Sequence, residues 1–235
     1  IPLRLVGSEM CIRDSDEVLK QFDFSSDIEI TLEANPDDLD QKFLKEIVQT
    51  EINRLSVGTQ SFFDEDLKMM NRAHNASQAE SSIKRSQDFG FENISIDLIY
   101  GSPTSDFEIW KQNLNKTIEL QVPHISSYAL TVEPKTALND WIKKKKITPP
   151  KEAEQNREFY YMSDFLKDKG FLHYEISNFA KPGFESKHNS AYWKYCEYLG
   201  IGPSAHSYNG REKRSWNVPN LSLIHISEPT RRRGI

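Results

Sequence analysis

Four short apolar runs constrain the fold of this chain most, because each ends in a polar residue and is followed by a polar stretch long enough for a helix. The runs are Ile28–Glu33, Asn53–Gln60, Asn93–Tyr100 and His124–Thr131. Buried parallel strands consist of nearly continuous β-branched and aliphatic residues, and α/β folds place ligand-binding groups at the carboxyl ends of such strands. The sequence therefore predicts that four polar side chains surround one site: Glu33, Gln60, Asp97 and Tyr128.

The spacing of these runs indicates the fold class. Successive runs begin about 25 to 40 residues apart, which is the length of one strand–helix unit in a barrel or in a doubly wound sheet. No glycine fingerprint follows a strand, so a dinucleotide-binding sheet is disfavoured and a partial α/β barrel is favoured. Beyond Pro150 the pattern changes to a long amphipathic helix over 152–169 and a strand over 174–179, which predicts a smaller α+β unit over 150–221.

Composition excludes several classes of protein. The 235 residues are 37% hydrophobic and 28% charged, which is enough apolar material for one large domain with a small appendage. No apolar stretch approaches the roughly 18 residues that span a bilayer, so membrane association is expected only through a partner. The net charge of −5 argues against a nucleic-acid partner. Two cysteines, Cys11 and Cys196, form no disulfide framework, which suits a cytoplasmic protein.

Both ends of the chain differ from the middle. The codons that can encode Met10–Ser15 read, when reversed and complemented, as codons for Leu221–Ser227. Such inverted pairs resemble translated transposase adapters from sequencing libraries, and segments of that kind are set aside before the fold is considered. Residues 1–15 and 222–235 are therefore expected to be non-native, and 16–149 is expected to form the barrel portion.

Several blocks of the interior, taken together and in order, resemble one known family. They are EITLEANPDDL, NRLSVGTQSF, the NRAH loop, ISIDLIYGSP, HISSYALTVEP, YEISNFA, HNSAYW and YLGIGPSAHSY. In this order they resemble the oxygen-independent coproporphyrinogen III oxidase family of radical SAM proteins, and within it the haem chaperone branch. The resemblance covers about 16–221.

The resemblance implies a partial six-stranded barrel that holds S-adenosylmethionine over a 4Fe-4S cluster. In the family a three-cysteine motif follows the first strand and a glycine-rich loop follows the second, and neither motif occurs in this sequence. The four runs would then be the third to sixth strands, and an amino-terminally truncated fragment without cluster ligands is expected to be inactive.

The resemblance also implies roles for the polar residues at the strand ends. Glu33 would bind the amino group of the methionine moiety, Gln60 and Asp97 the ribose hydroxyls, Arg72 the carboxylate, and Ala129 would lie against the adenine. The residues by themselves leave other interpretations open. A buried Glu33 could form a structural salt bridge, Gln60 and Asp97 could cap loops, and Arg72 could be solvated.

A second group of predicted site residues lies in the HNSAYW block. The resemblance implies that His188 is an axial ligand of a haem iron and that Tyr192 and Trp193 form an apolar wall. The structural alternative is that Asn189 caps an aromatic helix that ends at Gly200. Cys196 is expected to be buried in that helix.

Two other histidines of the interior, His124 and His206, could also bind haem or its propionates, but each is more simply a histidine with local hydrogen-bond partners.

Two functions from different classes remain open at this point. The first is a haem chaperone that binds S-adenosylmethionine, a cluster and haem, and delivers haem to a recipient protein. The second is an oxygen-independent oxidase that converts coproporphyrinogen III to protoporphyrinogen IX by radical decarboxylation.

Overall fold

The computed structural model describes residues 3–6 and 17–219, and these form two compact units, Pro2–Glu185 and Ser186–Ile235. The larger is called the sheet unit here and the smaller the C-terminal unit. The predicted boundary after residue 149 lies inside the sheet unit, since α7 and the hairpin that follows it pack against the sheet. Of the predicted non-native ends, only residues 3–6 are described, and the rest lie outside the described residues.

The sheet unit is built around a seven-stranded sheet with the order β1-β2-β3-β4-β5-β7-β6. The strands from β1 to β5 are parallel, and β7 pairs antiparallel with both β5 and β6. The strands are β1 Leu3–Val6, β2 Ile30–Ala34, β3 Arg54–Gln60, β4 Ile94–Tyr100, β5 His124–Ala129, β6 Leu172–Glu175 and β7 Asn178–Ala180. The four predicted strands are therefore present and parallel, with boundaries shifted by one or two residues at some ends.

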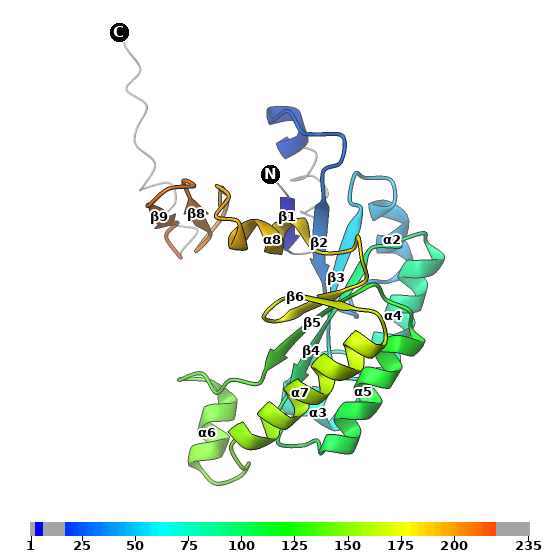
Figure 1. Cartoon of the computed structure of the whole chain (residues 1–235), viewed down its shortest axis with the longest axis vertical. Helices are drawn as coiled ribbons and strands as arrows, with labels where there is room; N and C mark the ends of the chain where they lie inside the picture. Colours follow the sequence, from blue (N-terminus) through cyan, green and yellow to red (C-terminus); the bar gives the residue numbers. More distant parts are fainter. Residues whose placement is uncertain (1–2, 7–16, 220–235) are drawn as a thin grey trace. The chain divides into compact units, whose positions relative to one another are not determined.

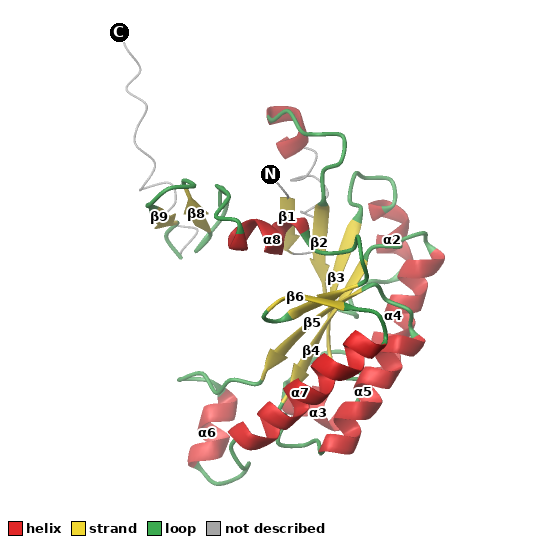
Figure 2. Ribbon diagram, in the orientation of Figure 1, coloured by secondary structure: helices red, strands yellow, loops and turns green. Residues whose placement is uncertain are grey.

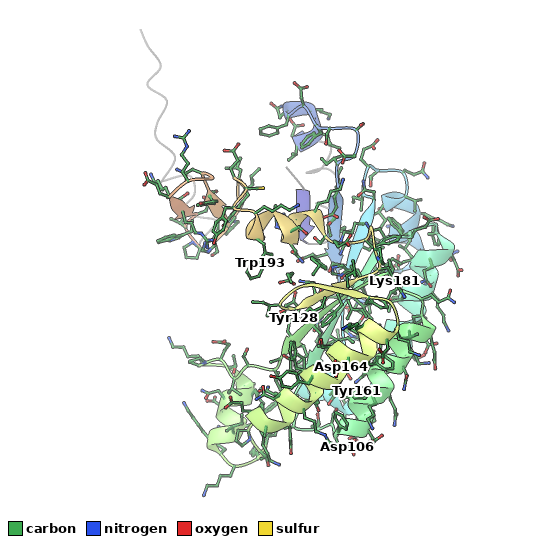
Figure 3. The ribbon with its side chains drawn as sticks, viewed as in Figure 1. Asp106, Tyr128, Tyr161, Asp164, Lys181 and Trp193 are labelled. Carbon is green, nitrogen blue, oxygen red and sulfur yellow. The ribbon has the colours of Figure 1, made fainter. Side chains whose placement is uncertain are left out.

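Helices α2, α4, α5 and α7 cover one side of this sheet (Figure 1). The helices of the unit are α2 Gln41–Ile47, α3 Asp64–Met69, α4 Ala76–Asp88, α5 Phe107–Glu119, α6 Ala137–Lys143 and α7 Glu152–Asp168. Figure 2 shows the alternation of strands and helices that carries the chain from β2 to β5. Figure 3 labels Asp106 at the start of α5 and both Tyr161 and Asp164 on α7, whereas Tyr128 comes from the end of β5. The described helices include none that is long and apolar enough to cross a membrane.

The two faces of the sheet differ in chemistry. Residues Leu32, Leu55 and Ile96 are fully buried and belong to the core beneath the helices. Their neighbours in sequence point to the other face, which is polar and carries Thr31, Glu33, Ser56, Ser95, Asp97, His124 and Ser126. The runs therefore alternate between apolar residues, which face the helices, and polar residues, several of which are also buried.

One local prediction in the sheet unit is wrong. The predicted strand over 174–179 is a hairpin, because Ile176 and Ser177 form a turn between β6 and β7. Helix α2 begins after Asp40, whose carboxylate accepts a hydrogen bond from the Phe43 amide at 2.7 Å. An N-cap residue is chosen by which side chain reaches the free amides of the first turn, which is worth about 1 kcal/mol.

The C-terminal unit contains α8 Lys187–Trp193, β8 His206–Tyr208 and β9 Arg214–Trp216. The expectation that Asn189 caps this helix is wrong, because Ser186 is the N-cap and accepts a hydrogen bond from the Asn189 amide at 3.2 Å. The helix ends at Trp193, since the backbone turns at Tyr195 (φ 54°) and Tyr198 then pairs with Tyr208. Cys196 therefore lies outside the helix and is exposed, contrary to the prediction.

Candidate functional site

Three neighbouring parallel strands each contribute a polar side chain towards the carboxyl end of the sheet, namely Glu33, Ser56 and Asp97. Glu33 on β2 is opposite Ser56 on β3, and the Ser56 hydroxyl lies 3.4 Å from Oδ1 of Asp97 on β4. Both carboxylates are partly buried on the polar face. Two of the predicted ligand-binding residues are thus brought to the same part of the site, one on each side of Ser56.

The end of β3 departs from regular strand geometry. The pairing of β3 with β4 shifts between Val57 and Gln60, and Gln60 has a left-handed backbone with a φ of 64°. Glutamine seldom adopts this conformation, and such strained residues persist where the surrounding structure holds them, often at functional sites. Gln60 therefore sits at an irregularity of the kind that redirects a side chain.

Gly58 creates the space in which two predicted site residues meet. A Cβ at Gly58 would lie 3.0 Å from Nη2 of Arg72, 3.2 Å from Nε2 of Gln60 and 3.6 Å from Oδ1 of Asn35. The Arg72 guanidinium donates to Asn35 Oδ1 at 2.7 Å and to the Gly58 carbonyl at 3.1 Å. The structure thus brings Gln60 and Arg72 together above the end of β3.

Sequence reasoning missed His74, which lies two residues after Arg72 in the same loop. Its ring is buried, its Nε2 lies 3.2 Å from the Thr59 carbonyl, and its Nδ1 lies 3.6 Å from Oδ1 of Asp37. Burial, and secondarily the charge of Arg72, hold the pKa of His74 below its ordinary value against the opposing effects of Thr59 and Asp37. The only available signal was a histidine inside the NRAH block.

The end of β5 lies beside the end of β4. Ala129 pairs with Tyr100, and the Leu130 amide donates to the Tyr100 carbonyl at 2.8 Å. Ala129 is therefore at the same end of the sheet as Asp97, three positions further along the paired strands. Tyr128, which pairs with Ile99, is 42% exposed.

Helix α7 fixes the two strand ends that carry Asp97 and Ala129. The buried Glu158 carboxylate accepts a hydrogen bond from the backbone amide of Gly101 at 2.6 Å, and the side-chain amide of Gln155 donates to the Leu130 carbonyl at 2.9 Å. Burial raises the pKa of Glu158 to about 7, and the nearby charges of Glu154 and Asp66 add to this, although the Gly101 hydrogen bond opposes it. Glu158 was also missed, since nothing in a helical repeat marks one glutamate as buried.

The polar face of the sheet also carries a buried, hydrogen-bonded histidine at the start of β5. His124 is fully buried between the Ser95 hydroxyl, 2.7 Å from its Nδ1, and the Tyr174 hydroxyl, 2.7 Å from its Nε2. Both ring nitrogens are thus engaged. This arrangement agrees with the interpretation of His124 as a histidine with local partners.

The predicted haem residues lie in the C-terminal unit. On α8 the Nε2 of His188 lies 3.1 Å from the Tyr192 hydroxyl, and the two rings are perpendicular at 5.0 Å. The ring of Tyr192 also contacts Tyr198 edge to face at 4.8 Å. Trp193 is 54% exposed and Tyr192 is 41% exposed, so the helix presents flat aromatic surface beside an imidazole. His206 is exposed on β8 beside Trp216.

Residues able to hold a metal cluster were not found in the described parts of the chain. Among residues 3–6 and 17–219, no three histidine, cysteine or acidic side chains are close enough to hold a metal ion. Cys196 is the one cysteine that the structure describes, and Cys11 lies outside the described residues. The described residues therefore do not fit a 4Fe-4S cluster, which needs several thiolates.

Comparisons with known proteins show which proteins the chain is similar to. The model of the radical SAM superfamily matches residues 7–117. The chain is 39% identical over 191 residues to the haem chaperone HemW of Lactococcus lactis, covering 81% of this chain and 50% of that protein. It is 34% identical to the HemW of Escherichia coli, with 81% and 50% covered, and 36% identical to mouse mitochondrial radical S-adenosyl methionine domain-containing protein 1, with 81% and 43% covered.

The fold has a clear counterpart among solved structures. The coproporphyrinogen III oxidase HemN of Escherichia coli, described as a radical SAM enzyme, superposes with a TM-score of 0.77 at 23% identity. The match covers 95% of this chain and 57% of that structure. The radical SAM superfamily uses S-adenosylmethionine and a 4Fe-4S cluster. The chain spans about half the length of the curated relatives it matches. It belongs to the radical SAM superfamily and is a homologue of the haem chaperones named HemW.

Proposed function

We propose that the carboxyl end of the sheet in this chain binds S-adenosylmethionine. The observation that supports this most is the convergence of Arg72 and Gln60 over Gly58, at the end of the sheet that also carries Glu33, Ser56 and Asp97. One cation, two carboxylates and an amide complement a ligand with a carboxylate, an ammonium group and a diol.

Each residue has a role that its chemistry suits. Arg72 binds the ligand carboxylate, because its guanidinium forms no ion pair with any carboxylate in the described parts of the chain and its donors are held by neutral oxygens. Glu33 accepts from the ammonium group. Gln60 and Asp97 bind the ribose hydroxyls, and Ala129 leaves room for the adenine at the end of β5.

We further propose that the protein to which this chain belongs is a haem chaperone that delivers haem to a recipient protein. The named HemW relatives support this, as does the pairing of His188 with exposed aromatic rings on α8. An imidazole is a common axial ligand of haem iron, and a hydrogen bond from the ring to a neighbour fixes its orientation. In this arrangement Tyr192 orients the ring of His188, and Trp193 contacts the macrocycle.

The reaction of an oxygen-independent coproporphyrinogen III oxidase is the alternative. The likeness to HemN favours it, but at 23% identity this likeness speaks for the shared fold alone. The chaperone proposal therefore has more support. A cytoplasmic location is part of the same proposal, and it rests on the cysteine content of the sequence.

One experiment on the complete gene product separates the two functions. After anaerobic reconstitution of the cluster, protoporphyrinogen formation and haem retention are measured in parallel for the wild-type protein and for His188→Ala. We expect stable haem binding that His188→Ala abolishes, without porphyrinogen turnover. Robust turnover that His188→Ala leaves unchanged would contradict the chaperone proposal.

The control for the haem assay is His206→Ala, because His206 is an exposed histidine of the same unit with an aromatic neighbour, Trp216. It should retain haem as well as the wild-type protein does. Equal losses in both variants would show that histidines of the unit bind haem without selectivity.

A further inference from the structure

The loop between α3 and α4 carries Arg72 across the ends of β2 and β3, and it is fixed at several points. At its N-terminal end the loop is held by the backbone amide of Arg72, which donates to the Leu67 carbonyl at 2.9 Å. At its C-terminal end Asn75 is the N-cap of α4 and forms a capping box with Gln78. Between these two anchors the only deeply buried side chain of the loop is that of His74, with 3% of its surface exposed.

We propose that His74 is a positioning residue that holds the Arg72 guanidinium over Gly58, ready for the carboxylate of the ligand. The proposal deepens the S-adenosylmethionine site described above and rests on it for the identity of the ligand. It assigns a role to a side chain that would not itself touch the ligand.

The contacts of the imidazole explain how it could act. Its Nε2 lies 3.2 Å from the carbonyl of Thr59, the residue immediately before Gln60, and its Nδ1 faces Asp37 in the loop that follows β2. A neutral ring with its proton on Nε2 donates to Thr59, so one side chain connects the Arg72 loop to the irregular end of β3. Asp37 and Asn35 belong to the same short loop, and Asn35 accepts from Arg72.

The alternative is that His74 merely fills space. The hydrogen bond from His74 to the Thr59 carbonyl argues against that interpretation only in part. The same carbonyl also accepts from the Ser61 amide at 2.8 Å and would keep this partner without His74. The position of the Nδ1 atom is more telling. It is buried, it lies 3.6 Å from Oδ1 of Asp37, which is too far for a hydrogen bond, and it has no other hydrogen-bond partner among the described residues. An apolar residue of the same size would avoid the cost of this buried nitrogen.

The variants His74→Gln and His74→Leu test the proposal, because glutamine can place an N–H donor near the position of Nε2 and leucine cannot. Binding of S-adenosylmethionine to the full chain is measured by isothermal titration calorimetry. We expect His74→Leu to weaken binding by about tenfold and His74→Gln by less than about threefold, as for a hydrogen bond that orients a charged group.

A double-variant cycle distinguishes positioning from general destabilisation. If His74 acts through Arg72, then His74→Leu should cause no further loss of affinity in the Arg72→Ala background. Ile83→Val, a conservative change in the core of α4 away from the site, serves as the control for reduced stability and should leave binding unchanged. Additive losses, or equal losses in His74→Gln and His74→Leu, would overturn the proposal.

A measurement without ligand keeps the two proposals separable. In the ligand-free wild-type chain, long-range ¹H–¹⁵N spectra should show His74 with its proton on Nε2, and the Arg72 side-chain N–H signals should shift and broaden in His74→Leu. Unchanged Arg72 signals would overturn the role of His74 whatever the binding data show. Altered Arg72 signals in a chain that binds no S-adenosylmethionine would instead contradict the proposed ligand.

Discussion

The Nη2 atom of Arg72 lies 3.1 Å from the carbonyl oxygen of Gly58. It would lie only 3.0 Å from the Cβ atom of any other residue at position 58. The absence of a side chain at Gly58 thus lets a guanidinium approach the end of β3 this closely. Close approach of this kind is a common reason for glycine within a strand.

Gly58→Ala is therefore expected to damage the site and spare the fold. The new Cβ would lie 3.0 Å from Arg72 Nη2 and 3.2 Å from Gln60 Nε2, and both are ends of flexible side chains that can move away. The melting temperature should stay within a few degrees of wild type, whereas affinity for S-adenosylmethionine should fall by about tenfold, because a displaced clamp loses its alignment. Calorimetric titration and thermal unfolding measure both. Unchanged affinity would show that Arg72 does not bind the ligand from this position.

Asp97→Asn should weaken binding by removing a charge from the ribose site. The change keeps an oxygen that can accept from the Ser56 hydroxyl, so the fold should be unaffected. We expect affinity for S-adenosylmethionine to fall by about tenfold or more, since hydrogen bonds to charged groups are worth about 1.5 to 3 kcal/mol. The loss should be smaller for the 2′-deoxy analogue. Glu46→Gln, the same change at an exposed position of α2, is the control. A loss of equal size for both ligands would refute a ribose contact.

Glu158 makes stability depend on pH near neutrality. Its folded-state pKa, about 7, is above the ordinary value of 4.5, so the folded protein binds the proton more tightly than the unfolded chain does. Stability should consequently decrease as the pH rises from about 4.5 to about 7 and then level off, by at most on the order of 3 kcal/mol.

Urea unfolding of the wild-type chain and of Glu158→Gln between pH 4.5 and 8 tests this dependence. Glutamine keeps an oxygen for the Gly101 amide and does not titrate. The difference in unfolding free energy between the two proteins should therefore change over this range in favour of the variant at high pH. Parallel curves would mean that Glu158 is solvated.

His124 should remain neutral under conditions in which a free histidine is charged. Burial first, and then the positive charge of Arg54, hold its pKa well below the ordinary value of 6.5. The folded chain therefore binds fewer protons at this site than the unfolded chain does, and stability should be lost as the pH falls below 6.5. The ring ¹³Cε1 shift, followed by NMR down to about pH 5, should stay constant in the folded chain and titrate near 6.5 in urea. A titration near 6.5 in the folded chain would contradict the buried network with Ser95 and Tyr174.

The strands and the position of the site could be predicted because both depend on local sequence. Runs such as ISIDLIY combine β-branched residues with a polar residue at a fixed place, and parallel pairing then brings Asp97 towards Glu33 without further information. The family resemblance supplied what local sequence lacks, namely the role of Arg72, since a loop arginine is not distinctive by itself.

The remaining features depend on neighbours that are distant in sequence. The left-handed backbone of Gln60, the burial of His74 and the raised pKa of Glu158 each arise from contacts between segments that the sequence does not place together. The cap of α8 was misjudged for a simpler reason, because Ser186 and Asn189 are both good caps and only the path of the chain decides between them.

Titration of the ¹⁵N-labelled chain with S-adenosylmethionine, followed by ¹H–¹⁵N NMR, tests the central claim most directly. Saturable shifts are predicted at the amides of Glu33, Gly58, Gln60, Arg72 and Asp97. Methionine alone should perturb Glu33 and Arg72, and adenosine alone should perturb Gln60 and Asp97. Absence of saturable shifts, or shifts confined to α8 and the residues that follow it, would contradict a nucleoside site at the carboxyl end of this sheet.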